Sequence, residues 1–324
     1  MSTQSEFSLI DSYFTGTTSE RDDVILGIGD DCALLQCPAD HVVAVSIDTL
    51  VSGVHFFADV DAETLGHKSL AVGLSDLAAM GAKPAWFTLA ITLPDNDESW
   101  LQGFSQGLAK LAKQHNIQLV GGDTTKGPLT ISIQVHGFVK AEQALRRNQA
   151  QVGDLIYVSG SLGDAGAALQ LKLDQWHDEQ LTEQDLQYLI HRLEKPTPRN
   201  GLGIKLRDYA TSAIDISDGL SSDLGHILNK SGFGATINLA ELPLSAALKK
   251  IPHEKASQFA LNSGDDYELC FTIPAARQQE FESQFANESS LIGTIEAKHG
   301  LRIIQLDGQQ QTMTGAGGYD HFSA

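Results

Sequence analysis

The chain has 324 residues, of which 42% are hydrophobic and 30 are glycine, so it is long enough for two domains with buried cores. Its 41 acidic residues against 22 basic ones give a formal net charge of −19 at pH 7, which argues against non-specific binding to nucleic acid or to an anionic membrane. The three cysteines match neither a disulfide framework nor a metal-ligand spacing. We also find no export signal and no apolar run of about 18 residues, so we expect a cytoplasmic protein.

The first half of the chain alternates helix-like and strand-like patterns of hydrophobic residues, which indicates a mixed α/β fold. We predict strands at 42–47 and 130–139 and helices at 63–80 and 98–115. The helix at 63–80 should be largely buried, because Asp76 and Lys83 are the only charged residues from position 69 to position 84. Asp76 would then lie on a helix face of mostly small apolar side chains.

A polar segment at 141–154 is typical of a linker between domains, and we place the two domains at 1–148 and 149–324. The second half again mixes helices and strands. We predict strands at 155–159, 212–216, 267–273 and 301–306, helices at 164–173 and 220–229, and a polar surface excursion at 174–199.

Six short segments place an aspartate within or beside an apolar or small-residue run. They are GIGDD at 27–31, SIDT at 46–49, LSDLAAMGA at 74–82, GGDTT at 121–125, IDISDGL at 214–220 and SGDDYEL at 263–269. A carboxylate in burial-prone sequence is unfavourable to desolvate unless positive charge meets it. If several segments converge, each close carboxylate pair repels by about 3–4 kcal/mol at an effective dielectric constant near 20. Divalent metal ions are therefore the simplest counter-charge.

Most of these segments have a second interpretation when each is taken alone. The Ser-Asp pairs of SIDT and AIDIS each share a strand face that could simply meet water, and GIGDD could be a tight turn. Asp218 could cap the following helix, while GGDTTKG could be either a polar loop or a phosphate-binding one. Arg147 could be an ordinary surface arginine and His55 a packed histidine. Asp76 is the strongest indication of a functional residue. Neither helix capping nor exposure to solvent explains a carboxylate in the middle of a buried helix.

Three common nucleotide and metal motifs are missing from the sequence. It has no G-x-x-x-x-G-K-[ST] segment, which excludes a Walker-type site. The third glycine of the dinucleotide fingerprint does not follow Gly27 and Gly29. Asp215 cannot start an EF-hand loop, because His226 would occupy the twelfth position. A kinase built on this chain would need another scaffold.

Seven motifs follow one another over nearly the whole chain. They are GIGDDCALL, SIDTLVSGVHF, LSDLAAMGAKPAW, LVGGDTTKGPL, AIDISDGLSSDLGHI, SGDDYELCF and the terminal GYDHF. Together they closely resemble the thiamine-monophosphate kinase family, which belongs to the superfamily of aminoimidazole ribonucleotide synthetase and selenophosphate synthetase. The resemblance implies a PurM-like α/β fold of two domains. The N-terminal domain would bind ATP and Mg²⁺ and pair in a homodimer through a shared β-barrel, and the C-terminal domain would close the active site.

The activity implied by the resemblance is ATP-dependent phosphorylation of thiamine monophosphate to thiamine diphosphate, by direct in-line transfer assisted by several Mg²⁺ ions. The acceptor phosphate is already anionic near pH 7, so we expect no residue to act as a general base. Two alternatives stay open. One is another ATP-using synthetase of the same superfamily, and the other is a non-enzymatic regulator that binds nucleotide or metal.

Position by position, the resemblance also implies roles for individual residues. The implied metal ligands are Asp31, Ser46, Ile47, Asp48, Asp76, Asp123, Asp215 and Asp218, with Ile47 acting through its backbone. Gly122, Asp123, Arg147 and Ser217 match ATP contacts, and His55, Asp265 and Tyr319 match substrate contacts. The sequence departs from the family at Asp265, because the family commonly reads GEDYEL and the aspartate is one methylene shorter.

Overall fold

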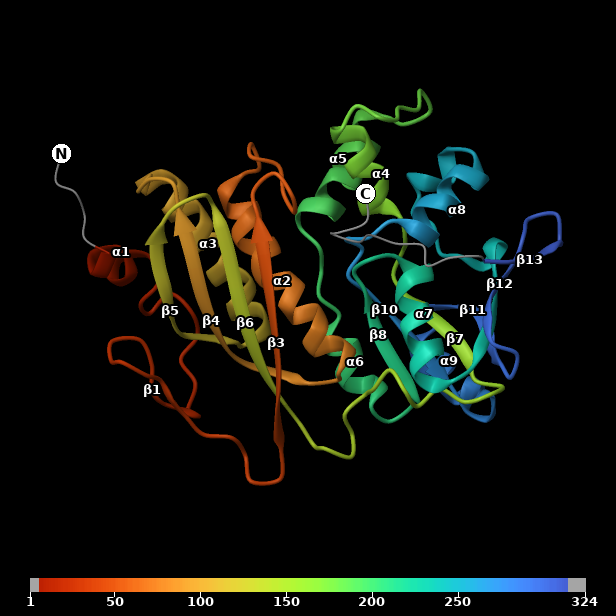
Figure 1. The fold of residues 1–324 in the computed structure, drawn as a ribbon, viewed down its shortest axis with the longest axis horizontal. Helices are drawn as coiled ribbons and strands as arrows, with labels where there is room; N and C mark the ends of the chain where they lie inside the picture. The colour runs from red at the N-terminus through yellow and green to blue at the C-terminus, as the bar shows by residue number, and fades with distance from the viewer. Residues whose placement is uncertain (1–5, 314–324) are drawn as a thin grey trace. The chain divides into compact units, whose positions relative to one another are not determined.

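The structure is a computed structural model that describes residues 6–313. Its residues form two units (Figure 1). Unit 1 comprises the chain up to Leu77 together with Ala82–Ala144, and unit 2 comprises Ala78–Gly81 and the chain from Leu145 onward. The division after Ala144 falls within the predicted linker. No helix of residues 6–313 is both long enough and apolar enough to cross a membrane.

Unit 1 is built on a four-stranded sheet in the order β3-β6-β4-β5. Its strands are β3 (Val42–Val51), β6 (Thr130–Val139), β4 (Lys83–Leu93) and β5 (Gln118–Lys126). β6 pairs antiparallel with both β3 and β4, whereas β4 and β5 are parallel. Within the described part of the chain this sheet is open, with β3 and β5 at its edges, so it contains no closed barrel. The mixed α/β class is confirmed, and the expected barrel is not seen in the single chain.

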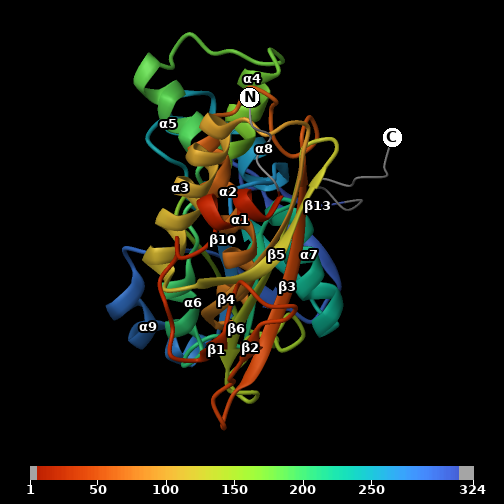
Figure 2. The same cartoon turned by 90° about the vertical axis from the view of Figure 1, so that its left-hand side faces the viewer.

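Helices α2 (Ala62–Ala79) and α3 (Glu98–His115) lie together on one side of this sheet, as the two views in Figures 1 and 2 agree. Residues Ile131, Ile133 and Val135 alternate along β6 and are buried. Val135 meets α2 directly, because a Cβ added to Gly73 would lie 2.9 Å from its Cγ1. α3 is amphipathic and buries its apolar face, whereas α2 is buried over almost its whole length from Leu65 to Ala79, as its sequence predicts.

The N-terminal part of unit 1 contains α1 (Glu6–Tyr13) and a small antiparallel sheet of β1 (Val24–Leu26) and β2 (Leu34–Leu35). Val24 and Leu35 from these strands pack against a cluster that includes Trp86 and Phe138. The rings of Trp86 and Phe138 meet edge to face with centroids 4.9 Å apart. This segment therefore covers part of the four-stranded sheet.

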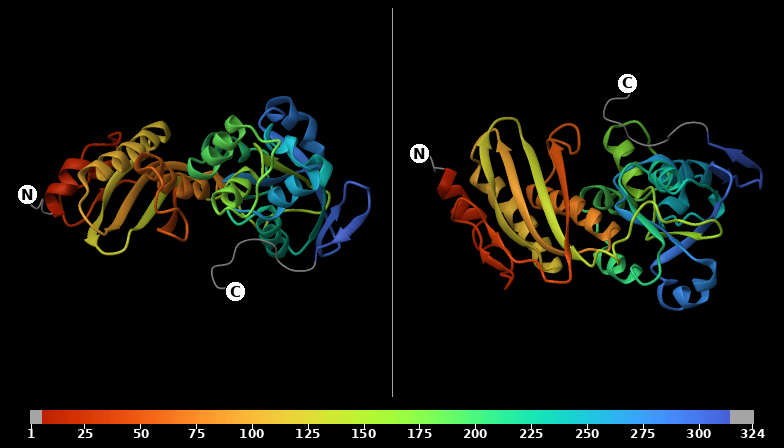
Figure 3. Two further views of the ribbon diagram at one scale, coloured as in Figure 1. Left: turned by 90° about the horizontal axis from the view of Figure 1, so that it is seen from above. Right: turned by 60° about the horizontal axis from the view of Figure 1, so that its bottom comes forward.

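Unit 2 is built on a seven-stranded sheet in the order β13-β12-β9-β11-β7-β10-β8. Its strands are β7 (Leu155–Ser159), β8 (Ser212–Ile216), β9 (Gly234–Asn238), β10 (Glu268–Ile273), β11 (Ser289–Glu296), β12 (Gly300–Ile304) and β13 (Gln310–Thr312). Neighbouring strands are antiparallel except β12 and β9, which are parallel. β13 is one edge of this sheet, seen in blue in both views of Figure 3.

Helices accompany the sheet of unit 2. They are α4 (Asp164–Lys172), α5 (Glu183–Glu194), α6 (Asn200–Leu206), α7 (Leu220–Ser231), α8 (His253–Asn262) and α9 (Gln278–Phe285), with short 3₁₀ turns at Leu239–Glu241, Leu248–Lys250 and Ala275–Arg277. Leu206 of α6 and Phe281 of α9 share a core cluster with Tyr157 and Phe271 of the sheet. α7 follows β8 directly, so the end of β8 and the start of α7 form one turn.

The prediction of a polar surface excursion at 174–199 is wrong, because α5 lies within it and is anchored in the fold. Thr182 and Asp185 form a capping box, in which each side chain accepts a hydrogen bond from the other residue's backbone N–H. Leu189 and Leu193 are buried, and so is Arg192. Leu186, Leu189, Ile190 and Leu193 recur at helical spacing along α5, and Nη2 of its buried arginine donates to groups far away in the sequence.

Candidate functional site

Three of the predicted metal ligands meet in unit 1 between β3 and α2. Ser46 and Asp48 lie on the same face of β3, two residues apart. The Oγ of Ser46 donates a hydrogen bond to Oδ2 of Asp76, which lies in the last turns of α2. Oδ2 of Asp48 lies 3.6 Å from the place where a Cβ on Gly73 would stand, an ordinary contact distance, so α2 passes directly beside this carboxylate.

One oxygen of the Asp48 carboxylate has no hydrogen-bond partner among the described residues. Its Oδ2 is buried and accepts no hydrogen bond from any residue in the 6–313 range. Burial, reinforced by the negative charge of Asp76, raises the pKa of Asp48 to about 7. A bound cation would relieve both the burial and the repulsion, and aspartate and serine oxygens suit a hard divalent ion. The residues present therefore fit a metal site.

Two other predicted residues adjoin β3 without joining this cluster through their side chains. Ile47 is on the opposite face of β3, where its side chain is 62% exposed, so only its backbone could serve a metal. His55 lies just beyond β3, and its Nδ1 accepts a hydrogen bond of 3.0 Å from the N–H of Val51. That bond fixes the ring relative to the end of the strand.

Asp31, Gly122 and Asp123 line a second feature of unit 1, a pocket of about 490 Å³. The wall is mixed, because apolar side chains such as Phe14 and Leu119 stand beside the carboxylates. A side chain at position 122 is impossible, since its Cβ would lie 1.9 Å from the carbonyl oxygen of Leu89. The pocket combines apolar surface with exposed backbone and charge, which is the usual make-up of a small-molecule site.

In unit 2, Asp215, Ser217 and Asp218 occupy the end of β8 and the turn into α7. Asp215 is buried within β8. The helix begins at Gly219 as its N-cap, without a side-chain capping bond. The alternative that Asp218 caps the helix is therefore not realised.

Asp223, which the sequence analysis did not single out, holds this turn in place. Its Oδ2 accepts hydrogen bonds from the backbone N–H groups of Ser217, Asp218 and Gly219, at 3.1, 3.0 and 3.1 Å. Burial raises the pKa of Asp223 to about 7, while the three donors act in the opposite direction. Its sequence signal is the second aspartate of SDGLSSD, one turn into the helix.

The loop that carries Asp265 lies against the same turn. The N–H of Asp265 donates to the carbonyl of Ser217 at 2.9 Å, and the N–H of Tyr267 donates to the carbonyl of Ile216 at 2.8 Å. Asp265 and Tyr267 have φ angles of 67° and 51°, in the left-handed region that non-glycine residues rarely adopt. Strained backbone of this kind is often found at binding sites. The structure thus brings Ser217, Asp218 and Asp265 together.

Two predicted residues remain, Arg147 and Tyr319, and Arg147 is not part of the clusters described above. Arg147 is exposed, and its carbonyl oxygen accepts a hydrogen bond of 3.1 Å from Ser231. Tyr319 lies outside the described residues. Among residues 6–313, no three acidic, histidine or cysteine side chains form a ready set of metal ligands. The pair of Asp48 and Asp76 is accordingly the strongest local indication of a cation.

Comparison with known proteins defines first a class and then a family. The model of the AIR synthase related protein N-terminal domain matches residues 29–139, and that of the C-terminal domain matches residues 151–305. The chain is thus an AIR synthase-related protein with a two-domain PurM-like fold. Its sequence is 49% identical to thiamine-monophosphate kinase of Escherichia coli K12 over 98% of each chain. The chain belongs to the thiamine-monophosphate kinase family, and it is an enzyme.

Solved structures agree with this membership. The crystal structure of thiamine-monophosphate kinase from Stenotrophomonas maltophilia K279a has a TM-score of 0.83 and 47% identity, covering 90% of this chain and 93% of that one. A structure described as AaThiL complexed with AMPPCP and TMP has a TM-score of 0.76 and 31% identity, covering 89% of each chain. The family resemblance seen in the sequence is confirmed.

Proposed function

We propose that this protein transfers the γ-phosphoryl group of ATP to thiamine monophosphate and releases ADP and thiamine diphosphate. The observation that carries the proposal is the 49% identity to a thiamine-monophosphate kinase over 98% of the chain. The AaThiL structure, which is described as a complex with AMPPCP and TMP, supports the choice of both substrates. In the transfer, an oxygen of the acceptor phosphate bonds to the γ-phosphorus while the bond from that phosphorus to the β-phosphate oxygen breaks.

The chemistry needs positioning and charge neutralisation more than proton transfer. The acceptor oxygen is already anionic near pH 7, so no general base is required, and we propose an in-line displacement. Bound Mg²⁺ ions would supply positive charge to the nucleophile and the leaving group. The orphaned Oδ2 of Asp48 and its raised pKa support the view that this chain is built to hold such ions.

We assign roles on this basis, with both units contributing residues. The proposed metal ligands are Asp31, Ser46, Ile47 (through its backbone), Asp48, Asp76, Asp123, Asp215 and Asp218. Gly122, Asp123, Arg147 and Ser217 are proposed to contact ATP. His55, Asp265 and Tyr319 are proposed to contact the acceptor. For the domains, we propose that 1–148 carries ATP binding, metal binding and dimerisation, and that 149–324 completes the active site. The free thiols of all three cysteines support a cytoplasmic location, where thiols stay reduced.

We also propose a homodimer in which the edge strand β3 takes part in a shared β-barrel. Val43, Val45 and Ile47 lie on one face of this strand and are 38%, 54% and 62% exposed. Native proteins usually cover an exposed apolar edge strand. Sedimentation should show a dimer, and Val45→Lys should weaken it, whereas Val152→Lys, at a 53% exposed valine outside the sheet, should not. A wild-type monomer would contradict this assembly.

The test of function is the choice of acceptor. Purified protein with ATP and Mg²⁺ should convert thiamine monophosphate into a species with diphosphate resonances in phosphorus NMR, and EDTA should stop the conversion. Faster phosphorylation of free thiamine would overturn the proposed acceptor. ATP binding without ADP release, whichever thiamine ester is added, would favour the regulator. ADP release that requires an acceptor unrelated to thiamine would favour another synthetase of the superfamily.

A further inference from the structure

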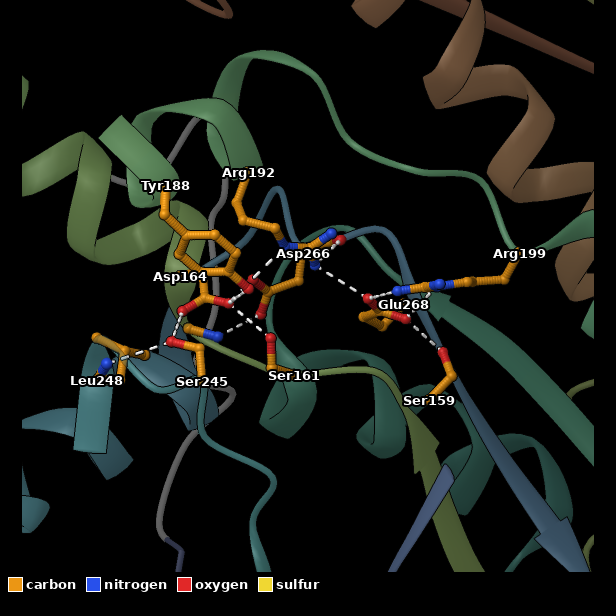
Figure 4. A network of polar contacts seen from close by, with 11 residues as sticks. Ser159, Ser161, Asp164, Tyr188, Arg192, Arg199, Ser245, Leu248, Asp266 and Glu268 are labelled. Atoms are coloured by element: carbon orange, nitrogen blue, oxygen red, sulfur yellow. Dashed lines mark hydrogen bonds and ion pairs between the residues drawn. The ribbon is translucent and has the colours of Figure 1, made fainter. Parts of the chain in front are cut away.

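A buried polar network surrounds Arg192 in unit 2 (Figure 4). The Nη2 of Arg192 donates to Oε1 of Glu268 at 3.0 Å, and its Nε lies 3.7 Å from Oδ2 of Asp164. The side chain of Arg192 is 10% exposed, and those of Asp164 and Glu268 are fully buried. An arginine held between buried carboxylates has little freedom to move, because leaving either one unpaired is strongly unfavourable.

Other groups fix the two carboxylates from their far sides. Glu268 accepts hydrogen bonds from Nε and Nη2 of Arg199 at 2.6 and 2.5 Å and from Oγ of Ser159 at 2.5 Å. Asp164 accepts bonds from Oγ of Ser161 at 2.6 Å and from Oγ of Ser245 at 2.5 Å. The network is therefore a rigid frame into which Arg192 reaches from α5.

Arg192 makes two contacts that its neighbour Arg199 does not share, one of which is the ion pair with Asp164. Its Nη2 also donates, at 3.3 Å, to the backbone carbonyl oxygen of Asp266. That carbonyl and the N–H of Tyr267 belong to the same planar peptide group. The N–H end of this peptide donates to the carbonyl of Ile216 at 2.8 Å. The peptide between Asp266 and Tyr267 is thus held at both ends, by the side chain of Arg192 at its carbonyl and by the backbone of Ile216 at its N–H.

The conformation of this peptide affects the position of Asp265, because the peptide lies between Asp265 and the tyrosine that contacts its carboxylate. The residues on either side of Asp266, which are Asp265 and Tyr267, both have left-handed φ angles. The side chain of Asp266 is also fixed, since its Oδ2 accepts a 2.7 Å hydrogen bond from the N–H of Gly163. Rotation of the held peptide would move Tyr267, whose hydroxyl donates to Oδ1 of Asp265 at 2.9 Å.

We propose that Arg192 is a positioning residue for acceptor binding, because it fixes the peptide that sets the conformation of the Asp265–Tyr267 loop. The inference rests on the proposed contact between Asp265 and the acceptor. Neutralising Glu268 does not account for Arg192, since Arg199 already pairs with both oxygens of that carboxylate. Besides its ion pair with Asp164, the distinctive contribution of Arg192 is its bond to the backbone carbonyl of Asp266.

The test compares Arg192→Lys with the matched control Arg199→Lys. Both variants keep a positive charge beside Glu268, but only the first removes the guanidinium Nη2 that reaches the Asp266 carbonyl. Arg192→Lys should raise KM for thiamine monophosphate about five- to tenfold and leave KM for ATP within about twofold. Arg199→Lys should leave both Michaelis constants near the wild-type values. Melting temperatures of the two variants show whether they share any general loss of stability.

Hydrogen exchange gives a readout that does not depend on the acceptor. In the ligand-free protein, Arg192→Lys should speed exchange at the amides of Asp265 and Tyr267, and Arg199→Lys should not. Unchanged exchange in Arg192→Lys would overturn the inference. Equal effects of the two variants would also overturn it, because the shared partner Glu268 would then be responsible. Faster exchange with an unchanged KM for thiamine monophosphate would instead show that Arg192 orders the loop and that Asp265 is not an acceptor contact.

If Arg192→Lys does not fold, Arg192→Gln is compared with Arg199→Gln, so that both variants lose the positive charge beside Glu268. The shorter Gln side chain does not reach as far as the guanidinium of Arg192, so the same differences in exchange and in KM are expected.

Discussion

The phenolic hydroxyl of Tyr267 donates a 2.9 Å hydrogen bond to Oδ1 of Asp265, two residues earlier in a loop where both residues have positive φ. Tyr267 is buried, so its ring is fixed by packing. The bond orients a carboxylate that we propose as an acceptor contact. A substitution at Tyr267 can therefore change the orientation of the Asp265 carboxylate without changing Asp265 itself.

Tyr267→Phe should keep the buried ring and remove only this bond. A hydrogen bond to a charged group contributes about 1.5 kcal/mol or slightly more to stability. Because this bond is present before the acceptor binds, only part of that free energy enters binding, so KM for thiamine monophosphate should rise severalfold, and by about tenfold at most. Tyr209→Phe is the matched control, since that hydroxyl accepts a hydrogen bond from Gln284, in a different part of unit 2. Steady-state kinetics check this result, and an equal effect of both variants on KM would contradict it.

Substitutions at Asp265 separate its charge from its backbone conformation. Asp265→Asn keeps a residue that tolerates left-handed φ and an oxygen that can accept from Tyr267. It should still raise KM for thiamine monophosphate, because the cationic acceptor loses a charged partner. Asp265→Ala should raise it further, while Asp265→Glu should change it by about 1 kcal/mol, or severalfold, at most. If Asp265→Ala instead raises KM for ATP and spares the acceptor, Asp265 belongs to the nucleotide.

Asp76→Asn should abolish turnover and leave the fold intact. The change removes one charge from beside Asp48, so the metal-free protein should be at least as stable as the wild type. The same change removes a proposed metal ligand, so Mg²⁺ should no longer support catalysis. Melting in EDTA and the Mg²⁺ dependence of the rate measure the two effects. An active variant, or an unfolded one, would refute the assignment.

The raised pKa of Asp48 makes the stability of the metal-free protein depend on pH. The folded protein keeps the Asp48 proton up to about pH 7, whereas the unfolded chain releases it near pH 4. The contribution of Asp48 to the free energy of unfolding is therefore fully present below about pH 4 and is lost as the pH rises to about 7. In EDTA, Asp48→Asn should melt at a higher temperature than the wild type at pH 8, and the difference should shrink towards pH 5.

Two controls isolate this effect. Asp59→Asn, at an exposed carboxylate of unit 1, should not change the pH dependence of melting. Added Mg²⁺ should stabilise the wild type at pH 8 more than it stabilises Asp48→Asn. A wild-type protein whose melting does not respond to Mg²⁺ would contradict a metal site at Asp48.

Asp223 should prove essential for the turn that carries Ser217 and Asp218. Asp223→Ala leaves three backbone N–H groups without their acceptor, which should lower stability by about 2–3 kcal/mol and raise KM for ATP. Asp97→Ala is the control, because Asp97 also accepts two backbone N–H groups, at the start of α3. It should lower stability by about 1 kcal/mol and leave KM unchanged. Thermal melting and initial rates distinguish the two, and an unchanged KM for ATP in Asp223→Ala would weaken the role given to Ser217.

The sequence alone determined the elements whose signals are local. The predicted bounds 98–115 are those of α3, because Asp97 caps its first turn and Asn116 adopts the left-handed conformation at its end. The predicted strands 130–139, 155–159 and 212–216 also coincide with β6, β7 and β8. Alternation and capping depend on residues within a few positions of each other, so they can be read without a fold. The family, too, was recognisable from the order of its motifs.

Only the tertiary structure decided which polar groups meet. α5 was missed although its capping box and the helical spacing of Leu186, Leu189 and Leu193 are local signals. What the sequence could not show is that Arg192 donates to Asp266 and Glu268, more than 70 residues away in the chain. Asp223 looked like an ordinary polar residue of a helix, and its three N–H partners appear only once β8 and α7 form their turn. The left-handed backbone at Asp265 and Tyr267 depends on hydrogen bonds to β8 and its following turn. Periodicity records which face of an element is buried, but the partner of a buried charge is set by how distant elements pack.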